Sequence, residues 1–107
     1  MPTDIARGNI RGQDLYNITL SPSSVANATS AEQTFSFKGL RTTDFVYVIK
    51  PTAQAGLGIV NTRVSAADTL AITFMNCTAA TITPTASEVY TLLLKRSEYV
   101  PLVTAIG

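Results

Sequence analysis

Residues 44–76 read DFVYVIKPTAQAGLGIVNTRVSAADTLAITFMN, and this stretch decides the fold class of the chain. It holds three apolar runs, at residues 45–49, 57–64 and 69–75, in which β-branched and aromatic side chains are frequent. Such side chains favour extended backbone, and the compact segments between the runs are built from proline, glycine, serine and aspartate. The stretch therefore predicts consecutive antiparallel strands, with a hairpin turn at residues 65–68.

The first of these runs, FVYVI at residues 45–49, has no polar residue and ends before Pro51. A short run without polar alternation is typical of a strand that is buried on both faces. We therefore expect this strand to be central and largely buried. Core positions suit the phenylalanines Phe35, Phe37, Phe45 and Phe74. The tyrosines are expected to present hydroxyl groups at an interface or at a sugar-binding surface: Tyr16, Tyr47, Tyr90 and Tyr99.

The rest of the chain continues the same pattern. Further strand-like segments lie at residues 13–20, 32–38 and 88–96, with a short strand or extended link at 81–84. Strands that recur every 8 to 14 residues or so, separated by turn-forming residues, are typical of a sandwich. We predict an all-β, antiparallel β-sandwich, jelly-roll-like or immunoglobulin-like, of about seven strands.

Two terminal segments flank the predicted sandwich domain at residues 13–96. Residues 1–12 show neither strand nor helix periodicity, and we interpret them as an N-terminal arm. Residues 97–107, SEYVPLVTAIG, are a C-terminal arm or an edge strand folded onto the core. A hydrophobic terminal segment on a small domain favours docking to a partner. The candidate interface residues are the apolar side chains of the two arms: Ile5, Ile10, Tyr99, Leu102 and Val103.

Composition narrows the classes of partner. Charged residues make up 14% of the 107 residues, against roughly 25% in an average soluble protein, and the formal net charge is +1. A surface with so little charge gives weak long-range repulsion between copies. Binding to nucleic acid needs a concentrated basic face, which this chain lacks, so we expect no nucleic-acid partner. The N-terminus lacks a signal-peptide pattern and no apolar run approaches 18 residues, so we expect neither secretion by that route nor a membrane partner.

The residue types that the chain contains also limit the reactions that it could catalyse. The chain has no histidine, which excludes a Ser-His or Cys-His nucleophile pair, and its single cysteine, Cys77, cannot form an intramolecular disulfide. The seven carboxylates are widely separated along the chain. Asp44 and Asp68 stand before strands at turns, where capping of backbone amides accounts for them. We therefore expect no catalytic residues, no cofactor and no metal site, and we interpret the chain as not an enzyme.

Three segments carry a resemblance to a known class of proteins. They are DFVYVIKP, QAGLGIVNTRVSAADTLAITFMNCTAA and ITPTASEVYT, which together cover about residues 34–96. In strand and turn style they resemble small virion proteins of tailed bacteriophages, most of all head decoration, or cement, proteins. Proteins of that class form compact β-domains outside the capsid and tie neighbouring major capsid subunits together.

The resemblance implies a non-enzymatic protein on the outer capsid surface of the virion. Its partners would be the major capsid protein and copies of itself, as a dimer or a trimer. The alternative is a tail- or fibre-associated β-module that recognises a host surface glycan, with exposed tyrosine and asparagine side chains clustered in loops at one end. An enzyme is the third alternative, and it would need carboxylates brought together by the fold.

Overall fold

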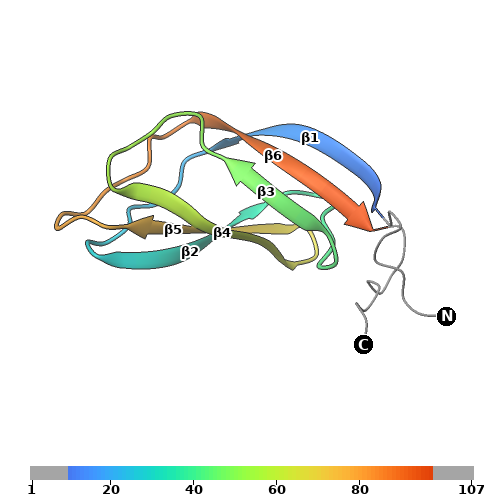
Figure 1. Ribbon diagram of the computed structural model, residues 1–107, viewed down its shortest axis with the longest axis horizontal. Coiled ribbons are helices and arrows are strands. Elements are labelled where there is room, and N and C mark those ends of the chain that lie inside the picture. Colours follow the sequence, from blue (N-terminus) through green and yellow to red (C-terminus); the bar gives the residue numbers. More distant parts are fainter. Residues whose placement is uncertain (1–9, 98–107) are drawn as a thin grey trace.

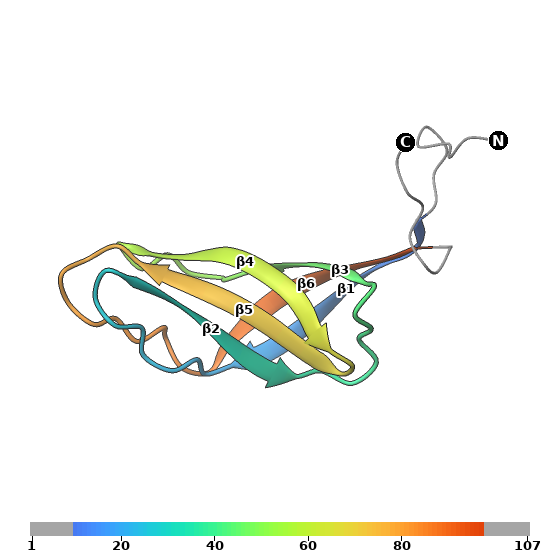
Figure 2. The same cartoon turned by 90° about the horizontal axis from the view of Figure 1, so that it is seen from below.

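The computed structural model describes residues 10–97, which form two antiparallel sheets of three strands each and no helix. The sheet orders are β1-β6-β3 and β2-β5-β4. Figure 1 shows the two sheets as layers, with β1-β6-β3 above β2-β5-β4, and Figure 2 shows them from below, with β2-β5-β4 in front. The strands are β1 (Ile10–Leu20), β2 (Thr29–Ser36), β3 (Phe45–Ile49), β4 (Leu57–Ala66), β5 (Thr69–Asn76) and β6 (Glu88–Ser97). The predicted all-β, antiparallel class is confirmed.

Each sheet is built around a central strand. In β6, Leu92 pairs with Tyr16 of β1 and with Val48 of β3. The other central strand, β5, pairs with β2 on one side and with β4 on the other. The pairing of β4 with β5 confirms the predicted hairpin, whose turn places Asp68 at a φ of 60°. The other four strands, β1, β2, β3 and β4, are therefore edge strands with one strand partner each.

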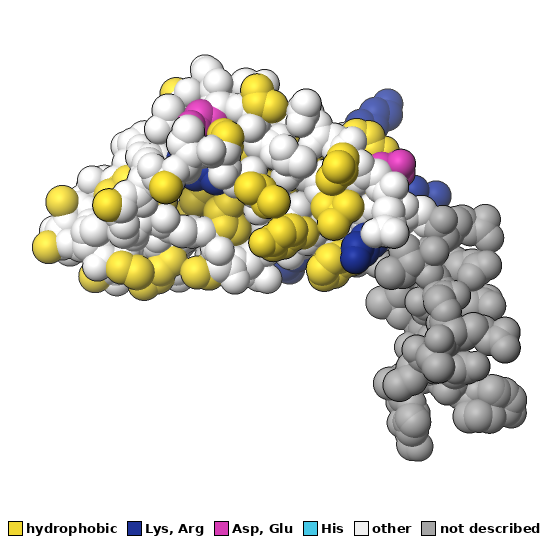
Figure 3. Space-filling model, turned by 45° about the horizontal axis from the view of Figure 1, so that its top comes forward, with side chains coloured by type: hydrophobic (Ala, Val, Ile, Leu, Met, Phe, Trp, Pro, Cys, Tyr) yellow, Lys and Arg dark blue, Asp and Glu magenta, His cyan; other side chains and the backbone are white. Residues whose placement is uncertain are grey.

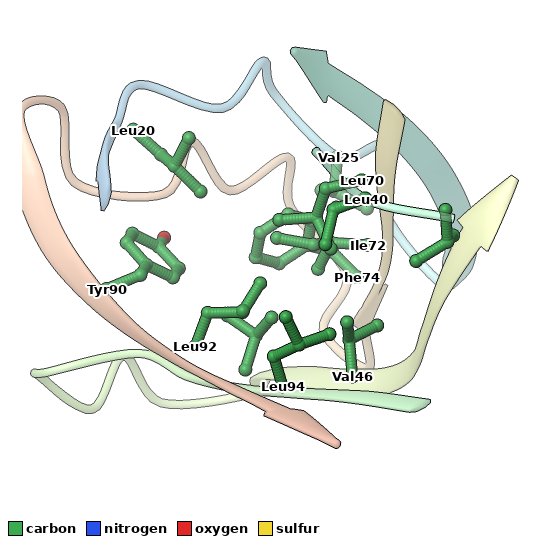
Figure 4. Close-up of a cluster of buried hydrophobic side chains, with 12 residues drawn as sticks. Leu20, Val25, Leu40, Val46, Leu70, Ile72, Phe74, Tyr90, Leu92 and Leu94 are labelled. Carbon is green, nitrogen blue, oxygen red and sulfur yellow. The ribbon is translucent and has the colours of Figure 1, made fainter. Parts of the chain in front are cut away.

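The hydrophobic core lies between the two sheets (Figure 4). Alternate residues of each central strand point inward, since side chains of a strand alternate between its two faces. Phe35 and Phe37 pack against the core from its margin, as predicted. The fully buried members from the central strands are Leu70, Ile72 and Phe74 of β5 and Tyr90 and Leu92 of β6.

The strand ends differ from the predicted ones by one to three residues in most strands, and three differences are informative. β1 begins at Ile10, three residues before the predicted start, and its register shifts between Ile10 and Gly12. β2 begins at Thr29, three residues before the predicted start, because the backbones of residues 29–31 pair with the end of β5, although the side chains of Thr29 and Ser30 are exposed. The predicted seventh strand is an isolated bridge between Val25 and Ile82 among the described residues. Pro84, two residues further on, has no N–H with which to continue a ladder.

Three predictions about burial were wrong, and one of them is the core position expected for Phe45, which is 59% exposed. The strand expected to be central, β3, is an edge strand in which Val46 and Val48 are buried while Phe45, Tyr47 and Ile49 are exposed. The run is apolar on both of its faces, but the fold covers only one of them. Tyr90, which was expected to present its hydroxyl at a surface, is fully buried on the inner face of β6.

The loops at one end of the sheets are held by a buried asparagine. The Asn76 amide nitrogen donates to the carbonyl oxygens of Val25, at 3.0 Å, and Ala80, at 2.8 Å. Its amide oxygen accepts from the backbone nitrogen of Thr78, at 2.8 Å, and from the hydroxyl of Thr78, at 2.7 Å. A buried amide with every bond satisfied ties the segment after β5 to the connection between β1 and β2.

The hydroxyl group of Tyr90 is buried without a hydrogen-bond partner among the described residues. Burial, and then the nearby charge of Glu88, raises the pKa of Tyr90 to about 12. The variant Tyr90→Phe removes an unpaired polar atom from the core. We expect its free energy of unfolding at pH 7 to rise by about 1–3 kcal/mol, measured by urea denaturation.

The pH dependence gives the same variant a second test. Because the unfolded chain ionises this tyrosine near pH 10 and the folded chain near pH 12, the wild type loses stability as pH rises between these values. Tyr90→Phe lacks this contribution, so the stability difference between the two proteins should widen over that interval. Tyr47→Phe, at an exposed tyrosine of the same sheet, is the control and should show neither effect. A Tyr90→Phe protein less stable than the wild type would show that the hydroxyl is paired.

Candidate functional site

The outer face of the sheet β1-β6-β3 is apolar. Strand pairing places Leu15, Leu93 and Tyr47 in one row across the three strands. Of this row, Leu15 is 70% exposed and Tyr47 54% exposed. Figure 3, which turns this sheet toward the viewer, shows hydrophobic side chains gathered over the middle of the molecule. We call this surface the apolar face, and it comprises Leu15, Phe45, Tyr47, Ile49, Val89 and Leu93.

The outer face of the other sheet is polar. Glu32 pairs with Thr73, and Thr34 pairs with Ala71, which the surrounding side chains cover completely. The Arg63 guanidinium donates to both carboxylate oxygens of Glu32, at 2.7 and 2.8 Å, across the central strand. This hydrogen bond is the main reason why the pKa of Glu32 is lowered. The two broad faces of the molecule therefore differ in character, and the apolar one is the better protein-binding surface.

The apolar face carries little charge. Two rows of paired residues flank the central row described above. One consists of Gln13, Lys95 and Phe45, and the other of Asn17, Thr91 and Ile49. The Lys95 ammonium lies 5.9 Å from the centroid of the Phe45 ring, a geometry that gives a weak cation–π contact at an exposed site. A partner could therefore dock on this face without burying an unpaired carboxylate.

A groove adjoins the apolar face where β3 and β4 lie beside each other. These strands belong to different sheets and do not pair, but the Thr62 hydroxyl donates to the Val46 carbonyl oxygen at 2.8 Å. The groove has a volume of about 440 Å³ and is lined by both strands and by Lys50 and Thr52. Val60 lies at a register shift of β4, lines the groove and is 61% exposed. The groove is therefore bounded by two strand edges.

The charged groups at one end of β3 are paired with each other. The Lys50 ammonium lies 2.9 Å from a carboxylate oxygen of Glu88, and it also donates to the Thr52 carbonyl oxygen at 2.9 Å. The Thr52 hydroxyl donates to the other carboxylate oxygen of Glu88. Hydrogen bonds from Thr52 and then from Lys50 lower the pKa of Glu88. These contacts hold the segment after β3 against the start of β6.

The other end of β3 is held by an ion pair. The Arg96 guanidinium donates to both carboxylate oxygens of Asp44, at 2.8 and 2.6 Å. The Arg41 backbone nitrogen donates to Asp44 at 2.9 Å, and Arg96 also donates to the Gly39 carbonyl oxygen at 3.0 Å. The predicted capping role of Asp44 is confirmed, while its partner on β6 was not foreseen because it lies far along the chain.

The candidate interface residues chosen from the sequence are not brought together in the described part of the chain. Ile10 is the first residue of β1 and pairs with Ser97, so its backbone belongs to the sheet. Ile5, Tyr99, Leu102 and Val103 lie outside the described residues.

The apolar face was not predicted from the sequence, although one signal of it was present. Residues 45–49 and 92–94 are apolar at odd and even positions alike, so each strand carries apolar side chains on both of its faces.

Within residues 10–97, no three or more acidic or cysteine side chains gather in a way that could hold a metal ion. The same residues contain no helix of the length and apolarity needed to cross a membrane. Comparison with family models, with curated proteins and with solved structures finds no match to this chain. The interpretation of the site therefore depends on its geometry.

The ion pair at the start of β3 gives a stability prediction. Asp44→Asn removes two charge-assisted hydrogen bonds and leaves Arg96 without its counter-ion. We expect a loss of about 1–3 kcal/mol in the free energy of unfolding at pH 7, measured by urea denaturation.

The acid dependence of stability provides a check on that variant. The hydrogen bond from Arg96 is the largest cause of the lowered pKa of Asp44. A lowered pKa stabilises the fold above the unfolded value, and this stability is lost as pH falls through the folded value. The gap between the wild type and Asp44→Asn should therefore close in acid, below about pH 4. Glu32→Gln, at the exposed ion pair with Arg63, is the control and should change stability little. An Asp44→Asn protein with unchanged stability would contradict the role of the pair.

Proposed function

We propose that this chain is a non-enzymatic capsid decoration, or cement, protein of a tailed bacteriophage. In this proposal it binds the outer capsid surface and stabilises the shell by bridging major capsid subunits. The observation that supports a docking protein is the apolar face, with Leu15, Phe45 and Tyr47 each more than half exposed on one sheet. The setting on a virion rests on the resemblance of residues 34–96 to decoration proteins.

The proposed mechanism is mechanical. The two sheets form a β-sandwich of the jelly-roll-like or immunoglobulin-like kind, and the apolar face lies against the shell across a joint between subunits. The terminal arms extend onto adjacent shell proteins or onto sister copies. Each copy then resists separation of the joint under the pressure of packaged DNA, and many copies act together.

The size of the apolar face fits a modest contact. The strands β1, β6 and β3 have 11, 10 and 5 residues. With a rise of about 3.3 Å per residue and a strand spacing of about 4.8 Å, they give a flat area of about 400 Å². A standard stable interface buries about 800 Å² on each partner. The face supplies roughly half of that area, so a second contact is needed for stable attachment, and repetition over a symmetric shell multiplies the gain.

The glycan-binding alternative expects exposed tyrosines in loops at one end of the sheets. The exposed tyrosines among the described residues, Tyr16 and Tyr47, lie instead within β1 and β3. The described structure therefore offers no observation in favour of that alternative.

The test mixes the purified protein with capsids that lack it and measures the copies bound per particle by sedimentation. We expect saturable binding of many copies per shell, and shells that survive heating at a higher temperature than bare shells. The variant Leu15→Asp places a charge in the central row of the apolar face. It should weaken binding about tenfold or more, because burial of a leucine is lost and a carboxylate must be desolvated.

Thr34→Asp is the matched control, since it introduces the same charge on the exposed, polar face of the other sheet. It should bind like the wild type. Wild-type protein that fails to bind competent capsids would overturn the proposal and bring forward adhesion to host-cell glycans. Equal binding by Leu15→Asp and the wild type would show that the apolar face is not the docking surface.

A further inference from the structure

β1 has one edge with which no other described strand pairs. In the sheet β1-β6-β3 it pairs with β6 on one side only. Figure 1 shows β1 as the outermost strand of its sheet, at the top of the molecule. Its register with β6 is unbroken from Gly12 to Leu20, so the open edge is regular over this length. An open edge with N–H and C=O groups is a template for another strand.

The other three edges are less suited to pairing. The edges of β3 and β4 lie beside each other and are joined by the hydrogen bond from Thr62 to Val46. β4 also has two register shifts. At β2, the Ser23 backbone nitrogen donates to the Gln33 side chain at 2.7 Å, and Gln33 donates back to the Ser23 carbonyl oxygen at 2.9 Å. The connection between β1 and β2 therefore lies against β2, whereas β1 keeps a regular edge.

One hydrogen bond shows which backbone groups point toward β1. The Val46 carbonyl oxygen accepts the Thr62 hydroxyl, so it points away from β6. In an antiparallel ladder, the backbone groups of alternate residues point to opposite sides of the strand. Tyr47, the next residue of β3, therefore directs its backbone groups to its partner Leu93, and Leu92 directs its own to β1.

The same alternation continues into β1. Leu92 pairs with Tyr16, and Leu94 pairs with Asp14, so the backbone groups of these two β1 residues are bonded to β6. The backbone groups of the alternate residues point to the open side and have no strand partner there among the described residues. These residues are Gln13, Leu15 and Asn17.

β1 lacks most of the usual protections of an exposed edge. From Gly12 to Leu20 it has no proline, no lysine and a single charged residue, Asp14. Its one register shift lies before Gly12. Natural proteins blunt exposed edges with such residues and with bulges, or they cover the edge with another segment. The edge of β1 is therefore of the kind that a further strand covers.

The side of β1 that faces the other sheet is incompletely covered. Tyr16 points to the same side as its partner Leu92, which is fully buried, yet Tyr16 is 40% exposed. Its ring meets the ring of the half-buried Phe37 edge-on, with the centroids 5.4 Å apart. Asp14, on the same side, is exposed as well. The sandwich is therefore open at the margin that β1 forms.

A second copy of β1 fits this edge by symmetry. Leu15 is the middle one of the eleven residues of β1, so antiparallel pairing about Leu15 uses the whole strand. Leu15 then lies opposite Leu15 of the other copy, and Gln13 lies opposite Asn17. Each of these pairs exchanges two backbone hydrogen bonds, and each uses groups that point to the open side.

The side chains favour this register over its neighbours. Asp14 lies opposite Tyr16 of the other copy, an uncharged residue with a hydroxyl donor. A shift of the pairing by two residues in one direction would place the two Asp14 carboxylates opposite each other, which is unfavourable. A shift in the other direction would place Asp14 opposite the apolar Ile18. The register centred on Leu15 avoids both.

This pairing would double the apolar face. A two-fold axis perpendicular to the sheet keeps the outer faces of both copies on the same side, with Leu15 of each copy at the junction. The two sheets then join into one sheet of six strands. Its outer face has an area of about 800 Å², twice that of one copy, which equals the area that a standard interface buries on each partner.

We propose that two copies of this chain associate through β1, strand against antiparallel strand, and present one continuous apolar face. The association is isologous, so it closes as a dimer. The inference rests on the proposed function in one respect, since the joined face supplies the area that stable attachment to the shell requires.

The test uses full-length protein without capsids. Because Gln13 lies opposite Asn17 of the other copy, the double variant Gln13→Lys with Asn17→Lys sets like charges opposite each other twice. Gln13→Glu with Asn17→Glu does the same with negative charge. Sedimentation velocity over a range of concentrations should show a monomer–dimer equilibrium for the wild type, and a dissociation constant about tenfold higher or more for each double variant. An equimolar mixture of the two should form heterodimers, because opposite charges then face each other.

Amide hydrogen exchange gives a second measurement, at single residues. The N–H groups of Leu15 and Asn17 point to the open side, so they should exchange fast in the monomer and slowly in the dimer. The N–H group of Tyr16 is bonded to β6 and should be protected in both states.

Controls separate this effect from misfolding and from the capsid contact. Thr34→Lys with Ser36→Lys places the same two charges at exposed positions of β2, and this protein should dimerise like the wild type. Circular dichroism and thermal unfolding of each double variant should match the wild type. Tyr47→Asp changes the apolar face on β3, away from the dimer contact. It should dimerise normally while losing capsid binding, so failure of this inference and failure of the proposed function give different results.

Three results would overturn the inference. The first is a wild-type protein that stays monomeric at every concentration, and protected Leu15 and Asn17 amides in that monomer would assign the edge to another segment of the same chain. The second is self-association of both double variants that equals that of the wild type. The third is a dimer in which the Leu15 and Asn17 amides exchange as fast as in the monomer.

Discussion

The packing of the two central strands against each other is the constraint on which the rest of the structure depends. Phe74 and Ile72 of β5 and Tyr90 and Leu92 of β6 are fully buried between the sheets. Each sheet consists of one central strand with a strand on either side, so every edge strand is held through β5 or β6. The inner-face side chains of both central strands are buried by this contact. The outer faces of the sheets and the sheet edges do not take part in it.

Polar contacts then hold the ends of the strands without covering these surfaces. The pair formed by Asp44 and Arg96 positions the start of β3, and Lys50 with Glu88 positions its end. Asn76 holds the loops at the opposite end of β5 from its hairpin. β3 is thus set firmly in place although it has one strand partner, and it presents both an apolar face and an open edge.

Much of the fold could be predicted from local pattern, and the failures have a common cause. The hairpin of β4 and β5 was predicted because its two strands and its turn are adjacent in the chain. The burial of β3 and Tyr90 was not, because it depends on which strand lies beside which and on what covers the outer face. Residues 45–49 are apolar on both faces, and such a pattern does not distinguish a central strand from an edge strand with one face exposed. The apolar face joins residues of β1, β3 and β6, which are far apart in the sequence.

The sequence by itself determined the strand-forming segments, the all-β class and the exclusion of histidine- and disulfide-based chemistry, because these follow from residue type and from local alternation. The tertiary structure decided the order of the strands, the uneven character of the two outer faces and the groove between β3 and β4. The physical reason is that side-chain alternation is a property of one strand, whereas exposure of a face or an edge depends on pairing between segments that are distant in the chain.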